Sequence, residues 1–132
     1  MTISRDGTGR ATVRAVRLES PWQLDGVLDE TFYQEVHPIG DFIQQAPDEG
    51  APASEPADAW VFFDDEFVYV AARLWESVPE SEWIANEMQR DSFQLIDNDG
   101  FIIVFDTFYD RRNGFAFRVN PIGGFSDQQI TD

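Results

Sequence analysis

Residues 57–75 read ADAWVFFDDEFVYVAARLW and carry the strongest structural signal in the chain. Two runs of apolar and aromatic residues, 57–63 and 67–75, flank the acidic segment 64–66. Runs of this composition fit a pleated, half-buried surface, and a short acidic segment between them is typical of a turn. The stretch therefore predicts a β-hairpin whose tip carries three carboxylates.

Other short elements are predicted on both sides of this hairpin. They are a strand at 11–18, a short helix from Leu28 to Val36, helical turns near 79–83 and 91–96, an apolar strand at 100–108, a hairpin turn at Asn113-Gly114 and a return strand at 115–120. The last segment, 121–132, is polar and glycine-rich. This pattern predicts an all-β fold, an antiparallel β-sandwich of the jelly-roll type with one or two short helices. We expect one domain over residues 18–132, preceded by an N-terminal arm and first strand over residues 1–17.

The apolar run 100–108 is unusual because both of its faces are apolar. Phe101, Ile103 and Phe105 alternate with Ile102 and Val104 along the predicted strand. A strand of this kind is expected to be central in its sheet and covered on both faces. The cover could come from further strands, from a partner subunit or from a fold smaller than the one expected.

The balance of charge excludes several classes of partner. The 132 residues carry 25 acidic and 9 basic side chains, a formal net charge of −16, and every basic residue is arginine. Such a chain is repelled by nucleic-acid phosphates and by anionic lipid headgroups, so we expect no nucleic-acid binding and no direct membrane binding. Neutral polyols and divalent cations are better candidates, although acidity also serves solubility. The absence of cysteine excludes disulfides, thiolate metal sites and cysteine nucleophiles.

Four blocks of sequence, taken in order, resemble one known family. They are LDGVLDE at 24–30, FDDEFVYVAAR at 63–73, RDS at 90–92 with FDTFYDRRNG at 105–114, and VNPIG at 119–123. Over roughly residues 18–132 they resemble the family 9 carbohydrate-binding module-like domains. The resemblance is greatest to a subgroup at the N-terminus of bacterial proteins that continue into a predicted outer-membrane β-barrel.

The resemblance implies a β-sandwich with structural calcium ions that binds the ends of sugar chains between aromatic side chains. It also implies an extracytoplasmic location, in the periplasm, at the outer membrane or outside the cell. In that family further strands follow the last block, so the resemblance implies a sandwich that is cut short at its C-terminus. Exposed strand edges in such a domain favour pairing or swapping between copies, which predicts a homo-oligomer.

Aromatic and polar residues at the end of the predicted hairpin are the candidate carbohydrate site. Trp75 is in phase with Arg73 and Tyr69 and is followed by Glu76. A sugar needs a flat apolar face for its C–H groups and polar neighbours for its hydroxyl groups, and this set offers both. Trp83, in a segment with loop character, is a second candidate ring. For each tryptophan, packing in the core is the alternative.

Two acidic clusters are the candidate calcium sites. Asp64 and Asp65 lie at the hairpin tip, and Asp97 and Asp99 lie in the loop before the apolar run. Calcium prefers about six to eight oxygen ligands, which carboxylates and loop carbonyls can supply. Neither cluster has the spacing of an EF-hand, and turn chemistry explains both about equally well. The charged residues of 106–112 predict either a polar groove for hydroxyl groups or an internal Asp–Arg pair that fixes the turn.

Three functions follow from these observations. The first is a non-catalytic carbohydrate-binding domain of a bacterial envelope or secreted protein. The alternatives are a structural or interaction domain without a sugar site, and a glycosidase that uses two carboxylates across a cleft. The single histidine, His37, lies at the end of the predicted helix, and no GxSxG motif is present, so the sequence does not point to a serine hydrolase.

Overall fold

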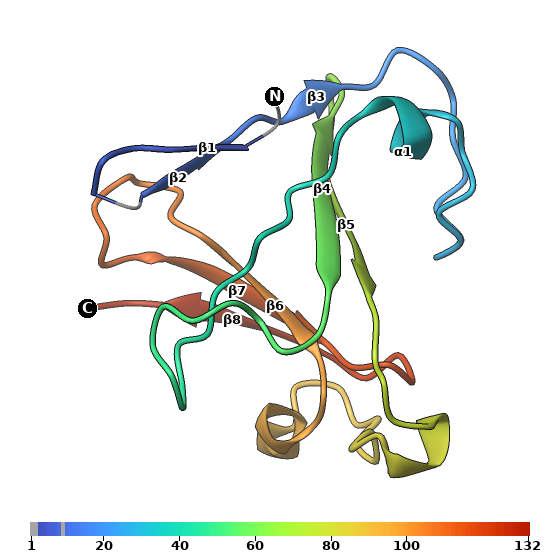
Figure 1. The fold of residues 1–132 in the computed structure, drawn as a ribbon, viewed down its shortest axis with the longest axis vertical. Helices are drawn as coiled ribbons and strands as arrows, with labels where there is room; N and C mark the ends of the chain where they lie inside the picture. The colour runs from blue at the N-terminus through green and yellow to red at the C-terminus, as the bar shows by residue number, and fades with distance from the viewer. Residues whose placement is uncertain (1–2, 9) are drawn as a thin grey trace. The chain divides into compact units, whose positions relative to one another are not determined.

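The computed structural model describes residues 3–8 and 10–132, and most of its regular structure is β-strand (Figure 1). In these residues helix is limited to one α-helical turn and two 3-10 turns. The elements are β1 (Ile3–Arg5), β2 (Ala11–Val13), β3 (Val16–Arg17), α1 (Phe32–Glu35), β4 (Ala57–Phe63), β5 (Val68–Leu74), η1 (Glu80–Glu82), η2 (Phe93–Asp97), β6 (Phe101–Phe105), β7 (Gly114–Val119) and β8 (Phe125–Ile130). The predicted all-β class with few, short helices is confirmed.

The chain forms two compact units, Met1–Ser77 and Val78–Asp132. The first unit contains the small sheet β1-β2 and the three-stranded sheet β3-β4-β5, and the second contains the three-stranded sheet β6-β7-β8. The predicted domain over 18–132 includes parts of both units and stays a prediction. Among the described residues, no helix has the length and apolar character that a membrane crossing requires.

The hairpin that the sequence predicts is present as β4 and β5. The two strands pair antiparallel, from Ala57 opposite Leu74 to Phe63 opposite Val68. On its other side β4 pairs with β3, so β4 is the central strand of the sheet. This second pair is parallel, whereas the sequence predicts only antiparallel pairs. The difference has a simple cause, because the long segment between β3 and β4 contains α1 and provides the crossover that a parallel pair needs.

α1 is a single turn and is shorter than the helix predicted from Leu28 to Val36. Val36 is already extended (φ −94°, ψ 116°), and Pro38 follows two residues later, where a helix could not continue. The N-terminal neighbour, Thr31, makes no capping hydrogen bond through its side chain. The short helix therefore depends on packing rather than on its own propensity.

An aromatic cluster joins α1 to the central strand β4 and forms the core of the first unit. Tyr33 of α1 packs edge to face against Trp60 and Phe62, with ring centroids 5.2 and 5.6 Å away. Trp60 also donates a hydrogen bond from Nε1 to the carbonyl of Val36 (3.0 Å). Trp60 is thus a core residue, as the alternative prediction for each tryptophan expects.

The second unit contains the two largest departures from the predicted strands. β7 is the central strand, and β6, the apolar run predicted to be central, lies at the edge of the sheet. That prediction was wrong because β8 pairs with the far side of β7, so that among the described strands β6 pairs with β7 alone. The sequence predicts no strand at β8, because FSDQQI is mostly polar and has little β propensity of its own.

The connections of the second unit agree with the sequence in one place and differ in another. η2 begins after Ser92, whose side chain accepts a hydrogen bond from the amide of Gln94, as expected for a helix N-cap. The predicted hairpin turn at Asn113-Gly114 is wrong, because β6 and β7 are joined by the loop 106–113. Gly114 is instead the first residue of β7.

Candidate functional site

The strongest candidate site lies at the end of β5 in the first unit. Trp75 follows the strand, and its side chain is 43% exposed. The guanidinium carbon of Arg73 lies 5.9 Å from the ring centroid of Trp75 and 5.8 Å from that of the buried Trp60. Arg73 also donates a hydrogen bond to the carbonyl of Leu28 (3.1 Å). Arg73 is therefore held between a core ring and a surface ring.

This arrangement has the chemistry that binding of a neutral sugar needs. The exposed part of Trp75 is an apolar surface suited to the C–H groups of a pyranose ring. Arg73 is itself exposed, and its hydrogen bond to a backbone carbonyl leaves further N–H groups for hydroxyl groups. The cation–π contact and the hydrogen bond restrain the guanidinium, so less conformational entropy is lost on binding.

Tyr69 lies on the same strand but has a different role. Its hydroxyl donates a hydrogen bond to Oδ2 of Asp64 (2.6 Å), and its ring packs edge to face on Trp22, with centroids 4.8 Å apart. The hydrogen bond to Asp64 raises the pKa of the tyrosine hydroxyl. Of the residues predicted to share the site, Trp75 and Arg73 are in contact, whereas Tyr69 binds Asp64 in the hairpin turn.

The other two predicted ligand-binding residues make local contacts. Glu76 is exposed, and its Oε1 accepts a hydrogen bond from the amide of Ser77 (2.9 Å). Trp83 follows η1 in the second unit, is 36% exposed and donates from Nε1 to the carbonyl of Val78 (3.2 Å). Trp83 is thus a surface ring that belongs to its own unit.

The acidic residues at the hairpin tip are engaged by donors from the protein. Oδ1 of Asp64 accepts hydrogen bonds from the amides of Glu66 and Phe67, both at 2.8 Å, and Oδ2 accepts the tyrosine hydroxyl. These bonds lower the pKa of Asp64. The hydrogen bond from Tyr69 has the largest effect, and the two backbone bonds add to it. The neighbouring Asp65 forms an ion pair with Arg17. The Asp64 carboxylate therefore stabilises the turn, which is one of the two roles that the sequence predicts for this cluster.

The second acidic cluster is only partly engaged. Oδ2 of Asp99 accepts a hydrogen bond from the amide of Ile84 (2.8 Å), whereas Asp97 is exposed at the end of η2. Across the described residues, no three histidine, cysteine, aspartate or glutamate side chains are grouped closely enough to hold a metal ion. Calcium binding stays a prediction, and backbone carbonyls would have to supply many of its ligands.

A buried amide network in the second unit was not predicted. Asn120 is only 6% exposed, and its Nδ2 donates to the carbonyl of Glu87 (2.7 Å) and to Oδ1 of Asn98 (3.1 Å). Its Oδ1 accepts a hydrogen bond from the amide of Gly124 (2.6 Å). The network links the segment before β6 to the turn between β7 and β8, so its role is structural. In the sequence, the sign of this network is Asn120 itself, which belongs to the VNPIG block at 119–123.

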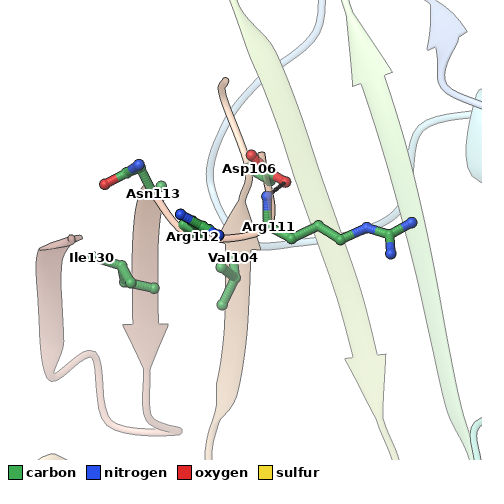
Figure 2. Close-up of a pocket in the computed structure, with 7 residues that line it drawn as sticks. Val104, Asp106, Arg111, Arg112, Asn113 and Ile130 are labelled. Carbon is green, nitrogen blue, oxygen red and sulfur yellow. Dashed lines mark hydrogen bonds between the residues drawn. The ribbon is translucent and has the colours of Figure 1, made fainter. Parts of the chain in front are cut away.

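The loop 106–113 borders a shallow pocket in the second unit (Figure 2). The pocket has a volume of about 210 Å³ and is lined by Val104, Asp106, Arg111, Arg112, Asn113, Gly114 and Ile130. Figure 2 shows the side chain of Arg111 extending away from Val104 and Ile130. Arg112 forms an ion pair with Asp132 at 3.6 Å.

The carboxylates of this loop bind its backbone rather than its arginines. Oδ1 of Asp106 accepts from the amide of Asp110 (3.1 Å), and Oδ2 accepts from the amide of Arg111 (2.8 Å). Asp110 in turn accepts from the amides of Arg112 and Asn113, both at 2.9 Å. The predicted internal Asp–Arg pair is therefore wrong for this loop, which is fixed by carboxylate caps instead.

Comparison with known proteins gives no match. No family model matches the chain, and neither a curated protein nor a solved structure matches it.

Proposed function

We propose that this chain is a non-catalytic carbohydrate-binding domain of a bacterial envelope or secreted protein. The observation that carries the proposal is the exposed ring of Trp75 beside the restrained guanidinium of Arg73. The resemblance of four sequence blocks to carbohydrate-binding module-like domains supports the same function. The proposed ligand is a neutral oligosaccharide, because a chain with a net charge of −16 disfavours acidic ones.

The proposed contact is a stack of one sugar ring on Trp75, with hydroxyl groups accepting hydrogen bonds from Arg73. The site is open, and a single ring and one arginine bury little ligand surface, so the affinity is expected to be modest. Removing the ring would remove the apolar platform and one partner of the cation–π contact. The loss should be at least about tenfold in affinity, which is about 1.4 kcal/mol.

The test is a titration of the whole chain with soluble neutral hexasaccharides of glucose, xylose and mannose. Binding is measured by isothermal calorimetry and by tryptophan fluorescence. At least one of the sugars should bind, and Trp75→Ala should weaken that sugar at least about tenfold. The matched control is Trp83→Ala, which removes a surface tryptophan of similar exposure in the other unit and should leave the affinity unchanged.

Two outcomes would overturn the proposal. One is the absence of binding to every sugar of the panel by the folded chain. The other is binding that Trp75→Ala and Trp83→Ala weaken equally, or that only Trp83→Ala weakens. Far-ultraviolet circular dichroism of both variants shows whether the strands remain intact.

A further inference from the structure

The two edges of the sheet β6-β7-β8 can be distinguished by the direction of their backbone groups. On β8, the amide of Asp91 donates to the carbonyl of Phe125 (3.0 Å), so that carbonyl points away from β7. Backbone groups alternate in direction along an antiparallel ladder. Those of Ser126, the next residue, therefore point towards β7, where its register partner is Arg118.

The same alternation continues across β7 to β6. Phe117, next to Arg118, directs its backbone groups towards β6 and is opposite Ile103. Ile102 and Val104, on either side of Ile103, therefore direct their N–H and C=O groups away from the sheet. Within residues 3–8 and 10–132, no hydrogen bond to these outward groups is found. We refer to the outward groups of Ile102 and Val104 as the open edge of β6.

The side chains at the open edge are apolar and exposed. Ile102 is 46% and Val104 is 56% exposed, and the strand that contains them reads FIIVF. It contains no charged residue and no proline, which are usual devices that keep an edge strand from pairing. Its composition is that of a segment with high β propensity that readily pairs with another strand.

The opposite edge of the sheet is protected in several ways. The segment before η2 lies along the first half of β8, where Asp91 donates to the carbonyl of Phe125 and accepts from the amide of Asp127 (3.0 Å). Asp127 places a carboxylate on this strand and pairs with Arg90. The guanidinium of Arg90 lies 4.7 Å from the ring centroid of Phe125. The contrast between the edges leaves β6 as the side that is open to a further strand.

We propose that the open edge of β6 pairs with the β6 strand of a second copy of this chain. The pairing is antiparallel about a two-fold axis at Ile103, so that Ile102 of each copy lies opposite Val104 of the other. The outward groups of these two residues then form four hydrogen bonds, and two three-stranded sheets become one continuous sheet.

A second copy suits this edge because the strand is complementary to itself. The two-fold arrangement places Phe101 opposite Phe105 and an aliphatic residue opposite each aliphatic residue. It also brings no carboxylate opposite another, although the chain as a whole carries a net charge of −16. A two-fold axis at Asp127 of β8 would set this carboxylate opposite its own copy, which like-charge repulsion disfavours.

The first test compares two variants. Each adds one negative charge, one on β6 and the other on β8, at the same level along the sheet. Val104 of β6 and Gln128 of β8 both lie opposite Ala116 of β7. Light scattering after size exclusion should give about twice the 15.1 kDa mass for the native chain and for Gln128→Glu. Val104→Glu should give the single-chain mass at the same concentration, because it sets a carboxylate into the apolar pairing.

The second test uses the absence of cysteine in the chain. In the proposed register Ile103 faces its own copy in a non-hydrogen-bonded pair with a Cα–Cα distance of about 4.5 Å, which a disulfide can bridge. Ile103→Cys should therefore become a covalent dimer on mild oxidation. The control, Gln129→Cys, places a thiol on the more exposed strand β8 and should cross-link much less.

The proposal is overturned if the native chain has the single-chain mass at every concentration tested. It is also overturned if a dimer persists in Val104→Glu, or if the two cysteine variants cross-link equally. Should Val104→Glu lose the circular dichroism of the native strands, the cysteine pair alone decides. Sugar binding does not enter either test, so the proposal stands or falls independently of the proposed function.

Discussion

Asp64 fixes the turn of the β4–β5 hairpin with one side chain. Both oxygens of its carboxylate accept hydrogen bonds, from the amides of Glu66 and Phe67 and from the hydroxyl of Tyr69. Its own amide donates to the carbonyl of Phe67 (3.0 Å), which closes the turn. All the donors favour the charged form, and the pKa of Asp64 is accordingly lowered from its ordinary value of 3.8.

The lowered pKa of Asp64 makes part of the stability of the chain dependent on pH. Since the folded-state pKa lies below the unfolded value, the unfolded chain binds the proton more tightly. The contribution of Asp64 is therefore fully present above about pH 3.8 and is lost as the pH falls through the lower, folded-state pKa. We expect Asp64→Asn to lower the free energy of unfolding at pH 7, and this difference from the native chain to shrink below pH 3.8.

Urea denaturation between pH 7 and pH 3 measures this difference. Asp48→Asn is the matched control, because no hydrogen bond of the Asp48 side chain is found within residues 3–8 and 10–132. The control should track the native chain across the range. A constant difference between Asp64→Asn and the native chain at all pH values would show that the ionised carboxylate does not stabilise the turn.

At the scale of elements, the β6–β7 pair is bounded by two glycines at points of close backbone approach. A Cβ on Gly100 would lie 2.5 Å from the carbonyl oxygen of Val119, and a Cβ on Gly114 would lie 2.2 Å from that of Phe105. Both distances are far below van der Waals contact, and both obstacles are backbone atoms that cannot swing aside. Glycine at these positions is therefore a requirement of the pairing rather than of turn conformation.

We expect Gly114→Ala to lower the free energy of unfolding by about 2–3 kcal/mol, because the added methyl group would separate β7 from the end of β6. Gly7→Ala is the control, since among the described residues, apart from Gly7 and its chain neighbours, no atom lies within 4 Å of the added Cβ. It should change the free energy by less than about 0.5 kcal/mol. Urea denaturation compares the two. Equal stability of both variants would mean that the strands are not held this closely.

At the scale of the whole molecule, charge repulsion opposes folding. The chain has 25 acidic and 9 basic residues, and four ion pairs are found among the described residues. Most carboxylates therefore repel one another through solvent, which salt screens. We expect the midpoint of thermal unfolding to rise by a few degrees between low-salt buffer and about 0.5 M sodium chloride.

The effect of calcium on the midpoint of thermal unfolding is a separate prediction. If calcium occupies one of the predicted aspartate sites, calcium chloride should raise the midpoint more than sodium chloride of equal ionic strength. Magnesium chloride at equal ionic strength is the control, because it matches the ion's charge but needs stricter geometry. Equal effects of calcium and magnesium would rule out a site that prefers calcium, and no rise with any salt would contradict the role of repulsion.

Local patterns in the sequence were sufficient for the class of fold and for its best-defined pieces. Alternation along 57–63 and 67–75 predicts the β4–β5 hairpin, and Ser92 predicts the cap of η2. The same alternation places Arg73 next to Trp75. These features depend on residues close in sequence, whose geometry is set by the strand period and by turn chemistry.

Only the tertiary structure decided which strand lies at an edge and which carboxylates are occupied. The composition of the run 101–105 is that of a central strand. In the part of the chain that the structure describes, however, β6 has one neighbouring strand, because the polar strand β8 takes the other side of β7. The parallel pairing of β3 with β4 and the burial of Asn120 likewise depend on segments far apart in the chain. Composition measures how well a residue tolerates burial or pairing, whereas its actual neighbours are set by which distant segments gain most from packing together.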